Sequence, residues 1–225
     1  MTFLNQVQGL TGLTISASGT NPTRDELSQF LRDGLIEVVN RIIQLNPAEV
    51  PKFCSESSDN SNAGITVTGK ILSIMREHDN ADILRACTPI SPQDRYDATD
   101  INSLKYRSKH NPGYYILDQK IYSVPASGGN NNDLKVSQVS YDTGLTHDDS
   151  ESGIENFPVE YAYLIALYAA VKSLEAKMAE YTIDEEDPEL VQSLSVNIAS
   201  LKNQYQDAFG IVAPRQERKA KEDES

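Results

Sequence analysis

The residue types best suited to chemistry in this sequence are two cysteines and three histidines. Cys54 and Cys87 lie far apart in the sequence, whereas a zinc site needs closely spaced ligands such as C-x-x-C. We interpret both cysteines as small buried hydrophobic residues, with a single disulfide between them as the alternative. His78, His110 and His147 fall in separate polar segments, so we expect each to be a solvated loop residue rather than a base or a ligand.

An acidic segment comes nearest to a metal site. Residues 148–155 place oxygen-bearing side chains at the first, third and fifth positions and a glycine at the sixth, as a calcium loop does. The twelfth position is Val159, where such a loop needs a glutamate, and no helix is predicted before the segment. Six acidic residues and no Lys or Arg lie from Asp142 to Glu160, which favours a solvated acidic loop.

The usual signatures of nucleotide binding and hydrolysis are missing from the sequence. It contains no G-x-x-x-x-G-K-[ST], no G-x-G-x-x-G, no G-x-S-x-G and no H-E-x-x-H. We therefore predict that the protein is not an enzyme, and that it has no catalytic residue, no cofactor and no metal. The informative residues are those of the predicted helices and strands.

The central element is a predicted helix over residues 157–181, with Pro158 in its first turn. Residues 161–171 carry no charge, and a helix that is apolar on all sides is enclosed on all sides. The run is too short to span a bilayer. Either this chain or other copies of it enclose the helix. For the second case the candidate inter-subunit contacts are Tyr161, Leu164, Ile165, Tyr168 and Ala169.

A second helix is predicted directly afterwards. Asp187 is a suitable N-cap, Pro188 suits the first helical position and Gly210 marks the end. The linker is short, so the two helices should form an antiparallel hairpin. One side of this helix is polar but almost uncharged, which indicates either hydrogen-bonding contact with another surface or plain exposure. Its residues are Gln192, Ser193, Ser195, Asn197, Ser200, Asn203 and Gln206.

Helix signals recur near the N-terminus, whereas the middle of the chain shows strand signals. Thr23 and Glu26 form a capping box, and apolar residues at helical spacing predict a helix over residues 24–45, with Gly34 permitting close packing. Residues 1–20 look weakly structured apart from one short helix. Strands are predicted at 65–68, 71–74, 83–90, 114–117, 120–124 and 135–141.

These elements predict an α+β fold, an antiparallel α-helical bundle with an inserted small antiparallel β unit. We predict an N-terminal arm and first bundle helix over 1–50, the β insertion over 51–156 and the C-terminal helical hairpin over 157–212. The remaining residues, 213–225, mix four basic and four acidic residues with little apolar content and are predicted to be a disordered charged tail.

The formal net charge of −13 over 225 residues argues against a basic nucleic-acid-binding surface. It leaves open an acidic surface past which DNA slides without adhesion, because phosphate binding depends on Lys and Arg. The N-terminal residues lack the pattern of a signal peptide, and no run is long enough to cross a membrane. We expect a soluble protein that does not contact a membrane.

The order of these segments resembles the head-to-tail connector, or neck adaptor, proteins of tailed bacteriophages. The resemblance rests on a capped helix, on the hairpin sequence NPGYYILDQKIYSVP, and on the junction FPVEYAYLIALYAAVKSL that follows an acidic loop. It covers residues 20–210 in arrangement. The lack of tryptophan, a longer β unit than some members have and the charged tail are departures that leave the tier of the neck open.

The resemblance implies a structural virion protein at the head–tail interface, assembled in the host cytoplasm. It implies a ring of the protein itself, commonly of twelve copies, that joins the portal protein to the tail or tail-terminator protein. Double-stranded DNA would pass through the lumen without specific binding. The alternatives are another virion component, such as a tail-completion or fibre-attachment protein, and a non-catalytic binding module.

Overall fold

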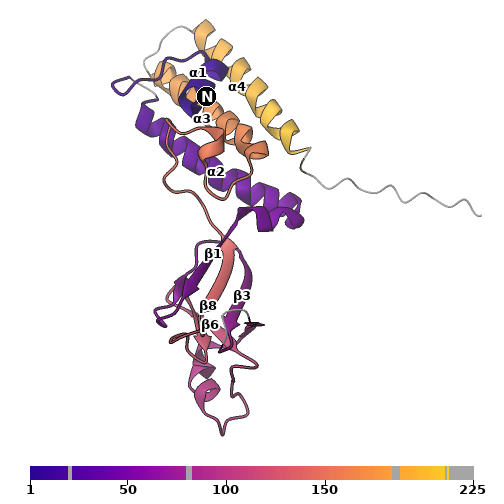
Figure 1. Ribbon diagram of the computed structural model, residues 1–225. Helices are drawn as coiled ribbons and strands as arrows, with labels where there is room; N and C mark the ends of the chain where they lie inside the picture. Colours follow the sequence, from indigo (N-terminus) through magenta and orange to yellow (C-terminus); the bar gives the residue numbers. More distant parts are fainter. Residues whose placement is uncertain (20–21, 80–82, 184–187, 211, 213–225) are drawn as a thin grey trace, which may run out of the picture. The chain divides into compact units, whose positions relative to one another are not determined.

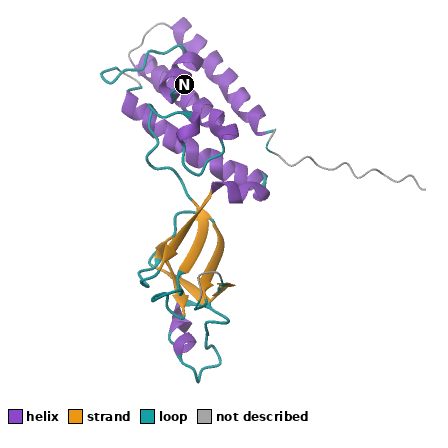
Figure 2. Ribbon diagram, in the orientation of Figure 1, coloured by secondary structure: helices purple, strands orange, loops and turns teal. Residues whose placement is uncertain are grey.

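The computed structural model describes residues 1–19, 22–79, 83–183, 188–210 and 212 (Figure 1). It is a mixed α and β structure that divides into two compact units. Unit 1 combines Met1–Glu49 with the chain from Asp142 onward, and unit 2 is Val50–Tyr141. The α-helices lie in unit 1 and the strands in unit 2 (Figure 2). The predicted tail and the predicted cap Asp187 lie outside the described residues.

The described residues of unit 1 form four α-helices whose ends follow the local sequence. At α2, the Thr23 side chain accepts a hydrogen bond from the Glu26 N–H and the Glu26 carboxylate accepts one from the Thr23 N–H, which confirms the predicted capping box. α4 ends where Gly210 follows it, also as predicted. The bounds are α1 Phe3–Thr11, α2 Arg24–Leu45, α3 Ala162–Ile183 and α4 Pro188–Phe209.

The start of α3 differs from prediction. Pro158 is in an extended conformation before a short 3-10 helix, η5 (Val159–Tyr161), so the α-helix begins only at Ala162. The short helix predicted within residues 1–20 is confirmed as α1, whose Phe3 and Val7 side chains are fully buried. Burial of these two side chains stabilises a helix that is short for independent formation.

α3 is the central helix of unit 1, with α1, α2 and α4 all in contact with it. Its Tyr168 ring lies 6.1 Å from that of Tyr205, and its Glu175 pairs with Lys202 at 2.8 Å. Positions later in α3 therefore contact positions earlier in α4, so the two helices are antiparallel. Because neighbours cover it, α3 buries most of the run 161–171 within a single chain.

The acidic segment after unit 2 belongs to unit 1, not to the β insertion as the boundary at residue 156 predicted. Main-chain N–H groups of Phe3 and Leu4 donate to the carbonyls of Asp149 and His147, both at 2.9 Å. The side chain of Leu145 is buried as well. The segment is thus anchored by backbone hydrogen bonds and by the buried Leu145. The acidic composition of the segment gives no indication of this burial.

The described part of unit 2 forms two four-stranded sheets, with strand orders β1-β8-β3-β4 and β2-β7-β6-β5. Every pair is antiparallel except β5 with β6. Side chains from both sheets form one core, made of Ile65, Ile74, Ile121, Leu134 and Val136. The strands are β1 Cys54–Asp59, β2 Ile65–Thr66, β3 Ile71–Glu77, β4 Leu84–Ala86, β5 Thr88–Pro89, β6 Gly113–Leu117, β7 Lys120–Val124 and β8 Leu134–Val139.

The predicted hairpin is confirmed as β6 and β7, joined by a two-residue turn at Asp118 and Gln119. Both turn residues have positive φ, 52° and 57°, as a type I′ turn requires. The single strand predicted over 83–90 is wrong, because β4 and β5 belong to different sheets. β1 was not predicted, since its sequence CSESSD lacks β-branched residues. Short 3-10 helices are η1 Pro47–Phe53, η2 Pro92–Arg95, η3 Asp97–Thr99 and η4 Glu151–Gly153.

Candidate functional site

The first half of α3 and the residues before it carry the five predicted contact residues, and the structure divides them into two groups. Ile165 and Ala169 are fully buried and Leu164 is 4% exposed within one chain. Tyr161 and Tyr168 are half-buried. Packing inside the chain therefore accounts for the apolar character of Leu164, Ile165 and Ala169. Of the five predicted contact residues, only the two tyrosines present surface to another molecule.

The two tyrosines also have partners within unit 1. The Tyr161 hydroxyl donates a hydrogen bond to the Glu49 carboxylate at 3.1 Å. The Tyr168 ring lies over Gly34 of α2, so close that a Cβ built on that glycine would come within 2.8 Å of Tyr168 Cδ1. This contact agrees with the expectation that Gly34 permits close packing.

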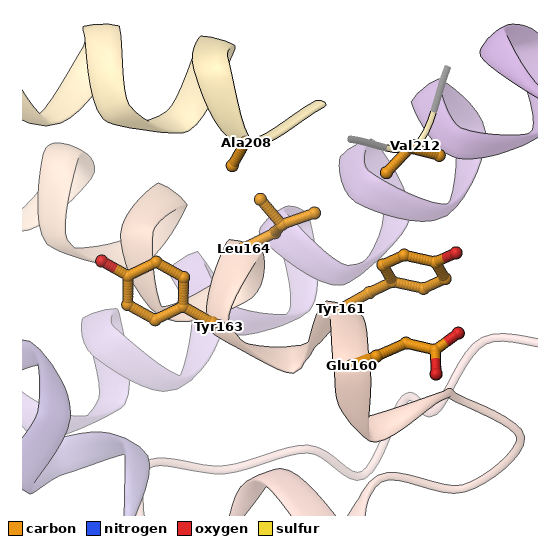
Figure 3. A pocket seen from close by; sticks show the side chains of 6 residues that line it. All are labelled: Glu160, Tyr161, Tyr163, Leu164, Ala208 and Val212. Atoms are coloured by element: carbon orange, nitrogen blue, oxygen red, sulfur yellow. The ribbon is translucent and has the colours of Figure 1, made fainter. Parts of the chain in front are cut away.

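Tyr163 is not among the five predicted contacts, yet it is the most exposed member of the apolar run, with 46% of its surface accessible. It lies on one side of Leu164 and Tyr161 lies on the other (Figure 3). No signal in the sequence separates Tyr163 from its neighbours, because the run is uniformly apolar and only the packing of α3 exposes one position.

An apolar pocket of about 380 Å³ opens where residues at the start of α3 meet the end of α4 (Figure 3). Leu164 and Ala208 face each other across it, and Tyr161, Tyr163 and Glu160 complete its α3 side. The buried Val212 closes its other end. The lining offers carbon surface and tyrosine hydroxyls, a combination suited to binding an apolar side chain of another molecule.

The outer face of α4 is the second candidate surface. From Gln192 to Gln206 its exposed side chains are polar or small, and Val196 is 64% exposed among them. The only charged one is Lys202, which pairs with Glu175 of α3. The exposed residues are Gln192, Ser193, Ser195, Val196, Asn197, Ala199, Ser200, Lys202, Asn203, Gln204 and Gln206. We call this set the α4 outer face.

Charge is divided unequally between the two units. Unit 2 contains ten Lys or Arg and ten Asp or Glu residues, so the whole formal net charge of −13 belongs to unit 1. The exposed positions of α2 include four acidic residues and no basic one, namely Asp25, Glu26, Asp33 and Glu37. Unit 1 is therefore strongly acidic, and α2 carries part of that charge on its surface.

The basic residues described in unit 1 are largely engaged inside it. Arg32 donates to the Leu145 carbonyl at 2.9 Å, and the Arg41 guanidinium lies 4.2 Å from the centre of the Phe209 ring. Lys172 and Lys202 both pair with Glu175. Burial alone would raise the pKa of Glu175, but hydrogen bonds from these two lysines lower it overall. Glu175 thus carries its negative charge at neutral pH and links α3 to α4.

The expectation that each histidine is a solvated loop residue holds for the exposed His110 and is wrong for His147. His78 Nε2 and His110 Nδ1 lie 3.0 Å apart, since unit 2 brings the two loops together. His147 is mostly covered, its Nδ1 lying 3.0 Å from the Ser28 Oγ of α2. Among the described residues, no three His, Cys, Asp or Glu side chains form a group that could hold a metal ion.

The two cysteines are free, so they do not form the alternative disulfide. Burial raises the pKa of the Cys87 thiol to about 12, which leaves almost no thiolate at neutral pH. Cys54 is half-buried, and burial likewise raises its pKa. Neither side chain is poised to act as a nucleophile.

The predicted acidic loop uses its carboxylates to shape its own backbone. Asp149 Oδ2 accepts hydrogen bonds from the N–H and the hydroxyl of Thr146, at 2.7 and 2.8 Å. Asp142 accepts from the Gly144 and Glu155 N–H groups in the same way. These carboxylates thus stabilise turns in the segment.

Within the described part of the chain, no helix has both the length and the apolar content that crossing a bilayer requires. Comparison with known proteins adds no relative, because neither a protein-family model nor a curated protein matches this sequence.

Proposed function

We propose that this chain is a structural protein of a tailed-phage neck, which forms a ring between the portal and the tail. The proposal is carried by the order of the elements: a capped helix, a β unit with a tyrosine-rich hairpin ending at Val124-Pro125, an acidic segment, then α3 and α4. This order resembles that of the neck adaptor proteins. In the proposed architecture α2, α3 and α4 form an antiparallel bundle and unit 2 is its insertion.

Two features of unit 1 support a role in assembly around DNA. Unit 1 carries the entire net negative charge, and a strongly acidic wall repels phosphate and lets a duplex pass without adhesion. The apolar pocket and the half-exposed Tyr163 provide surface for contact with another copy, the portal or the tail protein. In this proposal the protein is non-catalytic and resides in the virion neck.

The proposal is tested by following the mass of the purified protein in sedimentation velocity experiments over a range of concentrations. We expect a closed ring of about twelve copies, as the family resemblance implies, visible as annular particles in negative stain. A parallel experiment adds the protein to DNA-filled heads that carry a portal but lack this chain, and measures the fraction of heads that then accept tails.

The control for the second experiment is the same head preparation with bovine serum albumin in place of the protein. A chain that stays monomeric at every concentration, and that neither binds the heads nor restores tail joining, would rule out the neck proposal and leave the non-catalytic binding module.

A further inference from the structure

We propose that the α4 outer face is the surface through which the helical units of neighbouring copies contact each other. The inference rests on the proposed function, since it presupposes a ring, and it names the surface that holds the ring together. The occupant is a second copy of this chain.

The charge distribution selects the second copy as the occupant. Two copies of unit 1, each with a formal charge of −13, repel wherever acidic surfaces approach within the Debye length of about 8 Å at physiological salt. The exposed side of α2 cannot face another acidic unit without this cost, because its charged residues are all acidic. A basic partner would favour α2, whereas a like-charged copy favours the face that carries almost no charge.

The α4 outer face carries a single charged residue, rather than many residues of opposite sign that balance. Its one charged side chain, Lys202, already pairs with Glu175 of its own chain. The cores of protein interfaces are depleted in charged residues, since every buried charge must give up its hydration. Unit 2 is also neutral in sum, but it reaches neutrality with ten residues of each sign.

The size of the side chains permits close approach. Val196 lies about 200° round the helix from the buried Ile198, at the middle of the exposed side. Ala199 and Ser200 follow it, and small residues let another helix come near while losing little side-chain entropy. Serine, asparagine and glutamine at the edges supply hydrogen bonds of the kind that interface rims use.

The face extends over 15 residues, from 192 to 206, about 22 Å of helix. A stable interface buries about 800 Å² on each partner, more than one helical face provides. The apolar pocket adjoins the C-terminal end of the same helix through Ala208 and Val212, and it adds the exposed ring of Tyr163. We therefore place the centre of the contact on α4 and its apolar edge at the pocket.

The test changes the charge of the face without changing the fold. Val196→Glu and Ser200→Glu each introduce one negative charge at an exposed position, and glutamate has a higher helix propensity than valine or serine. We expect the concentration for half-assembly to rise at least about tenfold, with an unchanged melting temperature of the unassembled protein. The matched control is Gln44→Glu, the same charge change at an exposed position of α2, which should assemble like the wild type.

Ser200→Lys distinguishes a buried face from a general effect of net charge. A lysine makes unit 1 less acidic, so assembly limited only by overall repulsion would improve. If the face is buried between copies, the lysine must lose its hydration there, and assembly weakens as it does for the glutamate variants.

Assembly of Val196→Glu and Ser200→Glu at the wild-type concentration would overturn the inference while the neck proposal stands. Improved assembly of Ser200→Lys would overturn it in the same way. A wild-type protein that forms no ring, alone or on portal-bearing heads, would overturn both.

Discussion

At the scale of single residues, the closest contact in unit 1 is between Gly34 and Tyr168. Replacing Gly34 by alanine favours the helix by about 1 kcal/mol, but the new Cβ would stand 2.8 to 3.3 Å from three atoms of Tyr168. Overpacking of this kind costs about 1–3 kcal/mol, so we expect Gly34→Ala to lower the free energy of unfolding by about 1 kcal/mol. Urea denaturation measures the change.

Gly9→Ala is the matched control, since Gly9 lies inside α1 and a Cβ there meets no atom within 4 Å. It should stabilise by about 0.5–1 kcal/mol. In a Tyr168→Ala background the penalty at Gly34 should disappear. An unchanged penalty there would show that the cost does not come from the Tyr168 ring.

The buried Tyr205 should make the free energy of unfolding depend on pH in the alkaline range. Burial and, to a smaller extent, the negative charge of Glu37 raise the pKa of Tyr205 to about 12. In the unfolded chain a tyrosine titrates near 10. The folded state therefore holds this proton more tightly, and the stability it contributes is complete below about pH 10 and is lost as the pH rises towards 12.

We expect Tyr205→Phe to lose less stability than the wild type between about pH 9 and 11, as measured by urea unfolding at fixed salt. The lysine ion pairs weaken in both proteins over this pH range. The difference between the two proteins in the slope of unfolding free energy against pH therefore isolates the contribution of Tyr205. Equal slopes would contradict the assignment.

At the scale of elements, the turn between β6 and β7 has a conformation that its residues do not favour. Asp118 and Gln119 both have positive φ, for which Asn-Gly is the preferred pair. Asp118→Asn combined with Gln119→Gly should raise the free energy of unfolding by about 0.5–1 kcal/mol. Gln119→Val should lower it by about 1–3 kcal/mol, because a β-branched residue resists positive φ. Thermal melts followed by far-ultraviolet circular dichroism compare the three proteins, and a destabilised Asn-Gly variant would contradict the turn assignment.

Local signals explain which elements the sequence predicts correctly. α2 has a capping box and regular apolar spacing, and the β6–β7 hairpin has dense β-branched and aromatic residues on both sides of its turn. β1 is polar and forms only because β8 supplies its hydrogen bonds, so its existence depends on a segment about 80 residues away. Pairing across the chain also splits the run 83–90 between two sheets.

The candidate surfaces likewise divide into those that local sequence predicts and those that depend on long-range packing. The uncharged side of α4 is predicted from helical spacing alone, and the structure exposes it. Tyr163 and the pocket depend on how α3 and α4 pack, and the contact of His78 with His110 depends on the folding of unit 2. None of these has a counterpart in local sequence.

At the scale of the whole molecule, unit 2 should fold without unit 1. It has its own core and nearly all the strand pairing, and its 92 residues carry no net charge. We expect a fragment of residues 50–141 to keep its strand signal in circular dichroism and to unfold cooperatively. Unlike the full chain, it should not be retained by an anion exchanger at neutral pH. A fragment with no strand signal, under conditions where the full chain is folded, would contradict this independence.

The register of β1 and β8 pairs Cys54 with Val139, so the chain enters and leaves unit 2 at adjacent points. Recombination between related genes at these two points can therefore exchange the intervening segment while the helices on either side keep their spacing. Such an exchange changes the loops that unit 2 displays and leaves the α4 outer face intact. A lineage of such proteins can in this way adapt one unit to a new neighbour and preserve the other.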